Sequence, residues 1–299
     1  MTVNTQAART FIRTQARIVE KRLAEFHLDG VEDAATAAIA GLEAYRNADS
    51  GFGHGFEPDA LAPDSQPLAV DSAFDILDDV ASRTPLSSTR ERAADAARAA
   101  MPYLDSVSAA DGGLSIVLPS VAEHPRADHW GDGVFPPGLN PTAKIVGAAR
   151  ALGIDHPWVD RAARFCRTAV EAPDSVIDAH TALCVLRFLE SEADEKWAVE
   201  AYRDIRDRID DLAMFKPTPG PGYGLTPLDF APSPESPRRE FFADKAIEAH
   251  LDELVSAQEA DGGWSVPWTP PGQAALLAWR GVATLGALRV LRAYGRIES

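Results

Sequence analysis

One short pattern occurs three times in this chain, each time directly after a segment with helical periodicity. The three copies are NADSGFGHGF at 47–56, AADGGLSIV at 109–117 and EADGGWSVPW at 259–268. In each copy an alanine and an aspartate precede Gly-Gly or Ser-Gly and a bulky apolar residue. Glycine tolerates the left-handed backbone that ends a helix, and aspartate accepts hydrogen bonds from nearby amides. We therefore expect three glycine C-caps, each joining an outer helix to an inner one, with the bulky side chain folded back on the pair.

The rest of the sequence is dominated by helical periodicity. Apolar residues at spacings near three and four predict helices over the ranges 5–27, 32–47, 68–82, 89–107, 141–153, 157–171, 176–190, 192–212, 240–259 and 274–294. No strand pair is expected. The chain has 299 residues, of which 45% are hydrophobic, and this is enough to bury a sizeable core. The sequence predicts an all-α fold in one domain, residues 1–299.

Three connections are rich in glycine and proline, at 51–70, 111–140 and 216–237. Loops of this length in a compact domain are usually functional or disordered. Their aromatic and aliphatic residues argue against disorder. The prolines of the third loop exclude both helix and central strand there, because they break the hydrogen-bond ladder of either. We expect ordered loops that present functional side chains on a rigid helical scaffold.

The charge balance and the cysteines limit the possible partners and compartments. A formal charge of −16 disfavours nucleic acid as a partner. The N-terminal sequence has no secretory pattern, and no uninterrupted stretch of about 20 apolar residues occurs, so we expect a cytoplasmic protein without an integral membrane segment. Cys166 and Cys184 lie in helical patterns and are expected to be free thiols. The sequence does not indicate an oligomeric state.

The segment QEADGGWSVPW at 258–268 resembles the glutamine-tryptophan repeat of squalene-hopene and oxidosqualene cyclases. Similar turns occur in the β subunits of protein prenyltransferases. The resemblance implies an α/α toroid of five or six helix hairpins, with inner helices ringed by outer helices around an apolar cavity. In such a fold the three long loops would gather at one mouth.

The same resemblance implies an enzyme that acts on a hydrophobic small molecule, an isoprenoid or a similar lipid, by acid-initiated cyclisation or isomerisation. No cofactor is expected, apart from Mg²⁺ if the substrate is a diphosphate. Two alternatives remain open because one fold hosts many functions. The first is a non-catalytic toroid that binds a small molecule or a peptide. The second is a carbohydrate-active α/α barrel, which also pairs carboxylates in a cleft lined by Trp and Tyr.

Carboxylates in two places are candidates for the acid. In the loop 51–70, His54, Glu57 and Asp59 are held between glycines and prolines and are our first acid/base candidates. Asp71 and Asp75 come second. The string Asp-Ile-Leu-Asp-Asp at 75–79 differs by one residue from the Asp-x-Asp-Asp motif of squalene-type cyclases.

The acidic helix face at 71–79 has two interpretations. Its carboxylates form either a solvated acidic stripe, which is the simpler interpretation, or an acid cluster that faces the cavity. In the second case, burial and neighbouring carboxyls would keep one carboxyl protonated.

Candidate ligand-binding residues lie on helices and loops. Asp178, His180 and Cys184 have the residue types of a prenyltransferase zinc site but not its spacing, so no metal is expected. Basic residues in apolar helices, among them Lys144, need a partner, which is either an internal carboxylate or an anionic ligand group. Aromatic residues of the long loops either line a pocket or pack as a lid. The predicted substrate-binding residues are Trp130, Phe135, His180, Arg187, Tyr223, Phe230, Trp279 and Arg280.

Overall fold

The computed structural model describes residues 2–172, 175–192 and 195–298, and the fold is all-α as the periodicity predicts. Within these ranges the backbone forms no β-strand, only isolated bridges. The helices are α1 (Thr5–Gln15), α2 (Ile18–Asp29), α3 (Glu32–Leu42), α4 (Pro67–Arg83), α5 (Ser87–Ala99), α6 (Met101–Val107), α7 (Leu139–Ala151), α8 (Pro157–Val170), α9 (Ala179–Glu190), α10 (Lys196–Asp207), α11 (Pro227–Phe230), α12 (Asp244–Ser256) and α13 (Gln273–Ala293).

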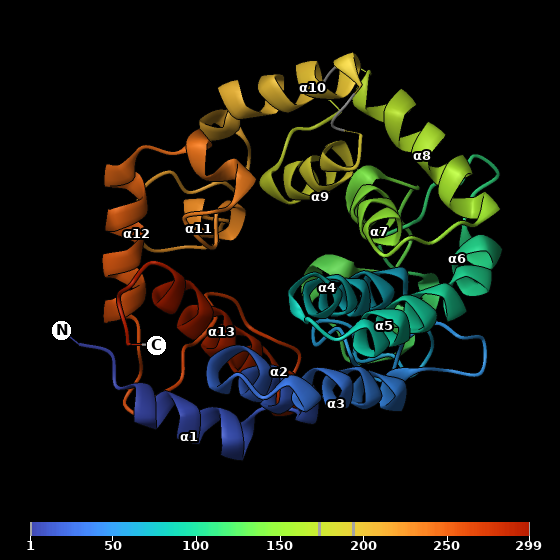
Figure 1. Cartoon of the computed structure of the whole chain (residues 1–299). Coiled ribbons are helices and arrows are strands. Elements are labelled where there is room, and N and C mark those ends of the chain that lie inside the picture. Colours follow the sequence, from blue (N-terminus) through green and yellow to red (C-terminus); the bar gives the residue numbers. More distant parts are fainter. Residues whose placement is uncertain (1, 173–174, 193–194, 299) are drawn as a thin grey trace.

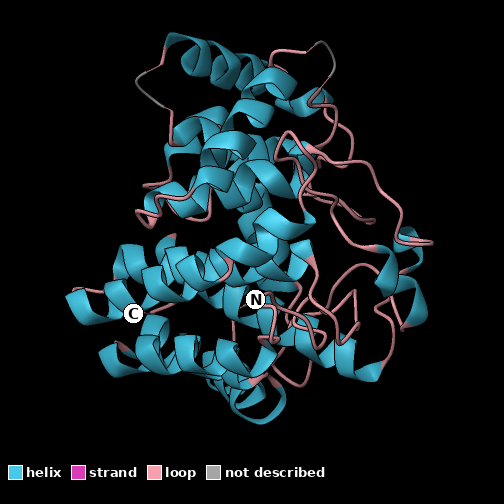
Figure 2. Cartoon of the chain, turned by 90° about the vertical axis from the view of Figure 1, so that its right-hand side faces the viewer, coloured by secondary structure: helices cyan, strands magenta, loops and turns pink. Residues whose placement is uncertain are grey.

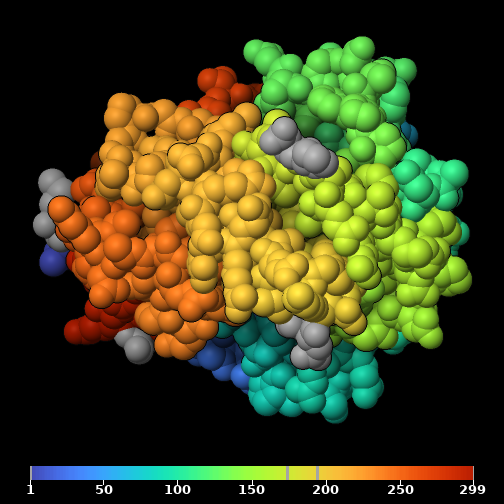
Figure 3. Space-filling model, turned by 90° about the horizontal axis from the view of Figure 1, so that it is seen from above, coloured from blue at the N-terminus to red at the C-terminus, as the bar shows by residue number. Residues whose placement is uncertain are grey.

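The helices lie in two series (Figure 1). In this view α2, α4, α7, α9, α11 and α13 lie inside, and α1, α3, α5, α6, α8, α10 and α12 lie outside. Outer helices pack against inner ones in the pairs α2–α3, α4–α5, α7–α8, α9–α10, α11–α12 and α13–α1. Viewed from above, α8, α10 and α12 cover much of that side of the molecule (Figure 3). The apolar faces predicted from the sequence therefore meet between the two series.

The segment 5–27 forms two helices rather than the single helix that its periodicity predicts. The chain breaks at Ala16 and Arg17, both of which have extended backbone. A Cβ at Gly281 of α13 would lie 2.9 Å from the Ala16 Cβ, so the break falls where α13 approaches closely. The Arg17 side chain also has a partner there, because its Nη1 donates to the Phe56 carbonyl at 2.7 Å. Tertiary packing overrides the local helical pattern at this point.

The three sequence repeats form the same turn. Asp49, Asp111 and Asp261 each accept through Oδ1 from the backbone N–H two residues later, at 2.9, 3.1 and 3.0 Å. The intervening Ser50, Gly112 and Gly262 have φ of 71°, 97° and 92°. The predicted aspartate bonds and outer-to-inner connection are therefore correct.

The predicted glycine C-caps are wrong in one respect. The preceding helical segments end at the cap residues Arg46, Ser108 and Ala257, so the left-handed residue lies inside the following turn rather than at the helix end. Two of the glycines, Gly112 and Gly262, instead allow the turn to lie close to the backbone of an outer helix. A Cβ at Gly112 would lie 2.6 Å from the Ala162 nitrogen of α8, and one at Gly262 would lie 2.4 Å from the Ala7 carbonyl carbon of α1.

The third turn ties together segments that are distant in sequence. Trp264 is 2% exposed, and its Nε1 donates to the Leu254 carbonyl of α12 at 2.8 Å, so the indole folds back on the preceding helix as expected. The Gln258 Oε1 accepts from the Asn4 N–H at 2.8 Å, and the Gln258 Nε2 donates to the Asn4 carbonyl at 3.0 Å. This reciprocal pair joins the start of α1 to the turn before α13.

Many of the loops gather on one side of the molecule, on the right in Figure 2. The third loop contains a short helix that the sequence analysis does not predict. Pro227 occupies the first turn of α11, where its missing N–H costs nothing, and Thr226 and Asp229 form a capping box there. Proline therefore starts this helix rather than preventing it.

Helix α13 is long and apolar enough to cross a membrane by length and composition, with a mean hydropathy of 1.4. The core helix of a soluble protein has the same properties. Here α13 packs against α1, α2 and α12, and its Arg280 and Arg289 pair with carboxylates. These contacts are those of a core helix.

Candidate functional site

The N-terminal ends of four inner helices and three of the preceding loops contribute to one group of side chains, which we name the central cluster. Asp71 of α4, Lys144 of α7, His180 of α9 and Trp279 of α13 lie in the first two turns of their helices. The loops add carboxylates and aromatic rings. The central cluster consists of Glu57, Asp59, Asp71, Lys144, His180, Tyr223, Trp268 and Trp279.

Four rings of the central cluster form a continuous aromatic row. His180 and Tyr223 stack with ring centroids 5.7 Å apart, and their ring nitrogen Nε2 and phenol oxygen are hydrogen-bonded at 2.6 Å. Tyr223 meets Trp268 edge to face at 5.3 Å, and Trp268 meets Trp279 in the same way at 5.2 Å. Tyr223 is 45% exposed, and the other three rings are half-buried, so solvent reaches the row. Burial raises the pKa of Tyr223 to about 12 and lowers that of His180, so both are neutral near pH 7.

Asp59 lies at the tryptophan end of the row. Its Oδ1 accepts from the Trp279 Nε1 at 2.9 Å and from the Trp268 Nε1 at 3.4 Å. Burial raises the pKa of Asp59 although both indole bonds oppose the shift. The backbone is also fixed, because the Asp59 carbonyl accepts from the Ala127 N–H at 2.9 Å. The long loop 111–140 therefore clamps the segment that carries this carboxylate.

Glu57 is the most strongly buried acid of the loop 51–70. The residue is 6% exposed, and its Oε2 accepts from the Ser72 hydroxyl of α4 at 2.9 Å. Burial, together with the negative charge of the neighbouring Asp59, raises the pKa of Glu57 to about 7, although the hydrogen bond from Ser72 opposes the shift. A carboxyl group in this position can hold a proton near neutral pH and release it to a substrate.

Asp71, Lys144 and Asp75 form an ion-pair triad. The Lys144 Nζ lies 2.8 Å from an Asp71 oxygen and 2.7 Å from an Asp75 oxygen. Burial raises the pKa of Asp71 to about 7, while the ammonium opposes that shift. The two carboxylates raise the pKa of Lys144 well above its ordinary value, against the effect of burial, so the lysine stays charged. Lys144 therefore pairs internally, which is one of the two roles that the sequence left open.

The rest of the acidic face of α4 is paired as well. Asp78 contacts Arg187 of α9 at 2.6 Å, and Asp79 contacts Arg289 of α13 at 2.6 Å and the His27 Nε2 of α2 at 2.8 Å. The simpler expectation, a solvated acidic stripe over 71–79, therefore holds only for Asp75, whose side chain is 54% exposed; it is wrong for Asp71, which is buried, and for Asp78 and Asp79, which are mostly covered by their cations. The cations come from helices far along the chain, and this pairing is not visible in the spacing of the carboxylates.

The remaining predicted acid/base residue lies apart from these contacts. His54 is exposed, with a left-handed φ of 54°.

The N-cap of α4 is Gln66, the residue before its first proline. The Gln66 side chain bonds the Leu118 N–H at 2.7 Å and the Ser120 hydroxyl at 2.9 Å, and so fixes the next long loop.

Several predicted substrate-binding residues have structural contacts outside the central cluster. Trp130 and Phe135 pack edge to face, 5.9 Å apart, in a small second core with Ala60 and Val121. Phe230 is 1% exposed and packs edge to face against Phe215 and Phe242 in the core. Arg187 pairs with Asp78 as described above.

Arg280 also pairs internally. It contacts Glu259 and Asp261 of the third turn at 2.7 Å each and lies over the Phe11 ring at 4.5 Å. Of the predicted binding residues, His180, Tyr223 and Trp279 join the central cluster.

The residues with prenyltransferase ligand types do not converge on a metal position. Asp178 caps α9, because its Oδ1 accepts from the His180 and Thr181 N–H groups at 3.0 Å each. Burial raises the pKa of the Cys184 thiol above its ordinary value, which disfavours the thiolate that a metal requires. In the described part of the chain, no group of three or more His, Cys, Asp or Glu side chains is arranged to hold a metal ion.

Sequence reasoning misses Trp268, a member of the central cluster, and Ser72, whose hydroxyl donates to Glu57. The repeat pattern favours a turn-packing role for Trp268, and no motif singles out Ser72. The signal for Trp268 is its position in the repeat, since it follows the third turn directly, and its indole reaches Asp59 in the loop 51–70 that follows the first turn.

Comparison with known proteins gives no match, either among protein-family models or among curated proteins.

Proposed function

We propose that the two helix series form an α/α toroid of six inner–outer pairs, a single-domain relative of the terpenoid cyclase and protein prenyltransferase toroids. The pairing of each inner helix with an outer one supports this architecture. So does the repeated Asp-Gly turn that leads from an outer to an inner helix. The contact between α1 and α13, which are distant in sequence, supports closure of the ring.

We infer that the central cluster is the active site of an acid–base enzyme that acts on a neutral sugar. The observation that carries the proposal is the placement of the buried Glu57 and Asp59 beside an aromatic row that solvent reaches. Indole and phenol rings stack on the apolar faces of sugars, and paired carboxylates carry glycosidic chemistry. Polar groups around the row, among them the Ser72 hydroxyl and the Lys144 triad, fit a hydroxylated ligand better than a hydrocarbon.

The roles follow from the two environments. Glu57 acts as the general acid, because its buried carboxyl holds a proton near neutral pH. Asp59, oriented by two indole N–H donors, supplies the second carboxylate at the developing positive charge of the sugar ring. Lys144 is neutralised by Asp71 and Asp75, so it leaves little positive charge for an anionic sugar.

An isoprenoid or similar lipid, converted by acid-initiated cyclisation or isomerisation, is the second candidate. Glu57 favours it, since a neutral carboxylic acid next to aromatic π faces can protonate an alkene and stabilise the resulting cation. The pairing of Lys144 also determines how a diphosphate substrate would be bound. With its charge already paired, a diphosphate group would need Mg²⁺ in its place.

The experiment compares two substrate panels on wild-type protein and on the Glu57→Gln and His54→Gln variants. The first panel contains neutral oligosaccharides and nitrophenyl glycosides. The second contains squalene and the prenyl diphosphates with and without Mg²⁺. We expect sugar turnover that falls at least about 100-fold in Glu57→Gln and is unchanged in His54→Gln, because His54 lies exposed outside the cluster.

Three other results would redirect the proposal. Turnover confined to the second panel would select the isoprenoid candidate. Saturable sugar binding without turnover would make the protein a binding toroid. Equal activity in wild type and Glu57→Gln would remove Glu57 from the mechanism.

A further inference from the structure

Two buried carboxylates of the central cluster have no cationic partner. The acidic side chains that are buried in the described part of the chain are Glu20, Glu57, Asp59 and Asp71. Glu20 pairs with Arg17, and Asp71 pairs with Lys144. The side chains of Glu57 and Asp59 instead accept from neutral donors, which are a hydroxyl, a backbone amide and two indoles. Neither forms an ion pair with another described residue.

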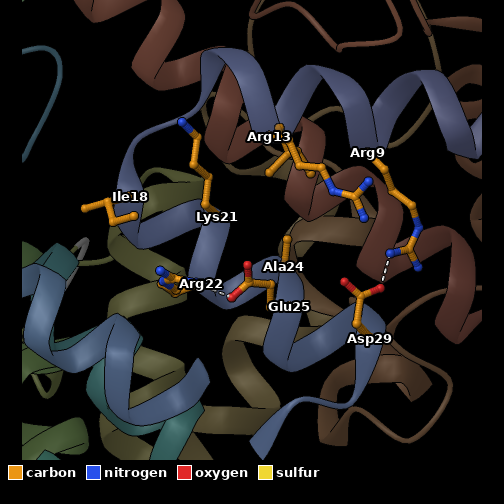
Figure 4. A pocket seen from close by; sticks show the side chains of 9 residues that line it. Arg9, Arg13, Ile18, Lys21, Arg22, Ala24, Glu25 and Asp29 are labelled. Carbon is orange, nitrogen blue, oxygen red and sulfur yellow. Dashed lines mark hydrogen bonds and ion pairs between the residues drawn. The ribbon is translucent and has the colours of Figure 1, made fainter. Parts of the chain in front are cut away.

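The carboxylates of a hollow elsewhere in the molecule are paired. Glu25 and Asp29 line a hollow of about 210 Å³ between α1 and α2 (Figure 4). Glu25 contacts Arg22 at 2.7 Å, and Asp29 pairs with Arg9. Even these partly exposed carboxylates have a cation, although water could solvate them. The more deeply buried Asp59 differs from them in having none.

Glu57 and Asp59 differ in how each can avoid an uncompensated charge. The pKa of Glu57 is about 7 because of its burial, so this side chain can hold a proton near neutral pH. Asp59 accepts both indole N–H bonds through one oxygen, Oδ1, and such bonds favour the charged form. No described residue donates to its Oδ2. A carboxylate that is 7% exposed and has no cation is costly, and a bound cation would remove that cost.

Aromatic rings stand at right angles to one another beside this carboxylate. Trp268 is inclined by 84° to Tyr223 and by 83° to Trp279. The N–H edges of both indoles point to the Asp59 Oδ1, so the corner between the two indoles lies next to the carboxylate. Solvent reaches the rings, since Tyr223 is 45% exposed. Aromatic faces of this kind, set around a cation, are the surroundings in which proteins bind methylated ammonium ions.

The acceptors beside the rings favour a methylated ammonium over a primary one. A primary ammonium has three N–H donors, and each of them needs an acceptor when it leaves water. Asp59 offers its Oδ2. The Glu57 Oε2 already accepts from Ser72, and the Tyr223 hydroxyl already bonds His180. A quaternary ammonium has no N–H donor, and its methyl groups can contact the aromatic faces directly.

We propose that Asp59, Tyr223, Trp268 and Trp279 form a binding site for a quaternary ammonium ion of the size of choline. The aromatic faces contact the methyl groups, and the Asp59 carboxylate neutralises the charge. The site overlaps the proposed active site, so the cation would compete with a sugar there. Its binding does not depend on turnover, and it can be measured directly.

The test is calorimetric titration of the full chain, at constant ionic strength, with choline and with its neutral isostere. In that alcohol a tert-butyl group replaces the trimethylammonium group. Asp59→Asn removes the negative charge from the site, and the matched control Asp64→Asn removes the same charge from an exposed position of the same loop. Trp268→Leu removes an aromatic face, whereas Trp268→Phe retains one. Circular dichroism checks that each variant is folded.

We expect saturable choline binding by the wild type, at least tenfold weaker in Asp59→Asn and Trp268→Leu, largely retained in Trp268→Phe and unchanged in Asp64→Asn. The neutral isostere should bind at least tenfold more weakly than choline. Choline binding by a protein that turns over no sugar would support this site and count against the proposed function. Additional binding to phosphatidylcholine vesicles, but not to phosphatidylglycerol vesicles, would support it with a lipid head group as the source of the cation.

Four results would overturn the proposal. The first is an absence of saturable choline binding. The second is equal affinity for the neutral isostere, which would make the site merely apolar. The third is equal weakening in Asp59→Asn and Asp64→Asn, which would assign the affinity to the overall charge of the chain. The fourth is tighter binding of ethanolamine than of choline, which would indicate a hydrogen-bonded primary ammonium instead.

Discussion

The Trp279 indole nitrogen donates to the Asp59 carboxylate at 2.9 Å, across 220 residues of sequence. The bond joins the loop after the first repeat to the helix after the third. It fixes the side-chain orientation of an acid whose backbone is already clamped by Ala127. The two long loops and the last inner helix therefore share one carboxylate.

The contribution of the Trp279–Asp59 hydrogen bond to stability can be compared with that of the longer Trp268–Asp59 bond. Trp279→Phe and Trp268→Phe delete the same atoms, but the second removes a bond of 3.4 Å rather than 2.9 Å. We expect Trp279→Phe to lower the free energy of unfolding by about 1–2 kcal/mol more than Trp268→Phe, since a hydrogen bond to a charged group is worth that much. Urea unfolding measures the difference. The difference should vanish in an Asp59→Ala background, and its persistence there would assign it to packing.

Glu57 should make the folded state less stable as the pH rises. Its pKa is about 7 in the folded chain against an ordinary value of 4.5, so between these values the folded state holds the extra proton. Stability from this group is complete below pH 4.5 and is lost as the pH rises through 7, by about 3 kcal/mol in total. Urea unfolding from pH 4.5 to 8 should show a loss of stability in wild type that is about 3 kcal/mol smaller in Glu57→Gln, where the loss due to Asp71, whose pKa is also raised to about 7, remains. Identical pH profiles would contradict the buried, protonated carboxyl.

The ion pair of Lys144 on α7 with Asp71 on α4 should contribute strongly to the free energy of unfolding. Lys144→Met leaves Asp71, which is 4% exposed, without its cation, and breaking a buried pair costs about 3–5 kcal/mol. The control is Lys196→Met, which removes an exposed lysine and should change stability by less than about 0.5 kcal/mol. The double change Lys144→Met/Asp71→Leu should restore part of the loss. A double variant no better than the single one would argue against the pair.

Two glycines should respond in opposite directions to the same substitution. Gly262→Ala places a Cβ 2.4 Å from the Ala7 backbone at a φ of 92°, and should cost at least about 2 kcal/mol. Gly286 lies exposed in α13, and a Cβ added there would have no neighbouring atom within 4 Å, so Gly286→Ala should stabilise the protein by about 0.5–1 kcal/mol. Thermal unfolding of both variants checks the signs. A neutral Gly262→Ala would mean that α1 is free to move away from the turn.

The helices and turns could be predicted from the sequence because their causes are local. Apolar spacing reports a helix face, and the Asp-Gly turns carry their own hydrogen bonds within a few residues. The break at Ala16 could not be found in this way, since its cause is the approach of Gly281 from the far end of the chain. The short helix α11 was not predicted for a related reason. Its first residue, Pro227, starts a helix only because Thr226 and Asp229 form a capping box, and without that information a proline is expected to prevent a helix.

The candidate site could be predicted in part. Glu57 and Asp59 stand out in the sequence because glycines and prolines fix their loop, and the structure places both beside the aromatic row. The acidic face of α4 could not be judged correctly, because burial of a carboxylate depends on its cation. Lys144, Arg187 and Arg289 come from three other helices, and no local pattern connects them to Asp71, Asp78 and Asp79.

The contact between α1 and α13 also has a consequence for synthesis. The ribosome completes α1 about 258 residues before it starts α13, counting from Gln15 to Gln273. At roughly 5–20 residues per second, the apolar face of α1 waits about 10–50 s for its partner. The part of α1 that packs against α13 stays uncovered throughout that interval, so the nascent chain presents a binding surface for chaperones that the finished protein has buried.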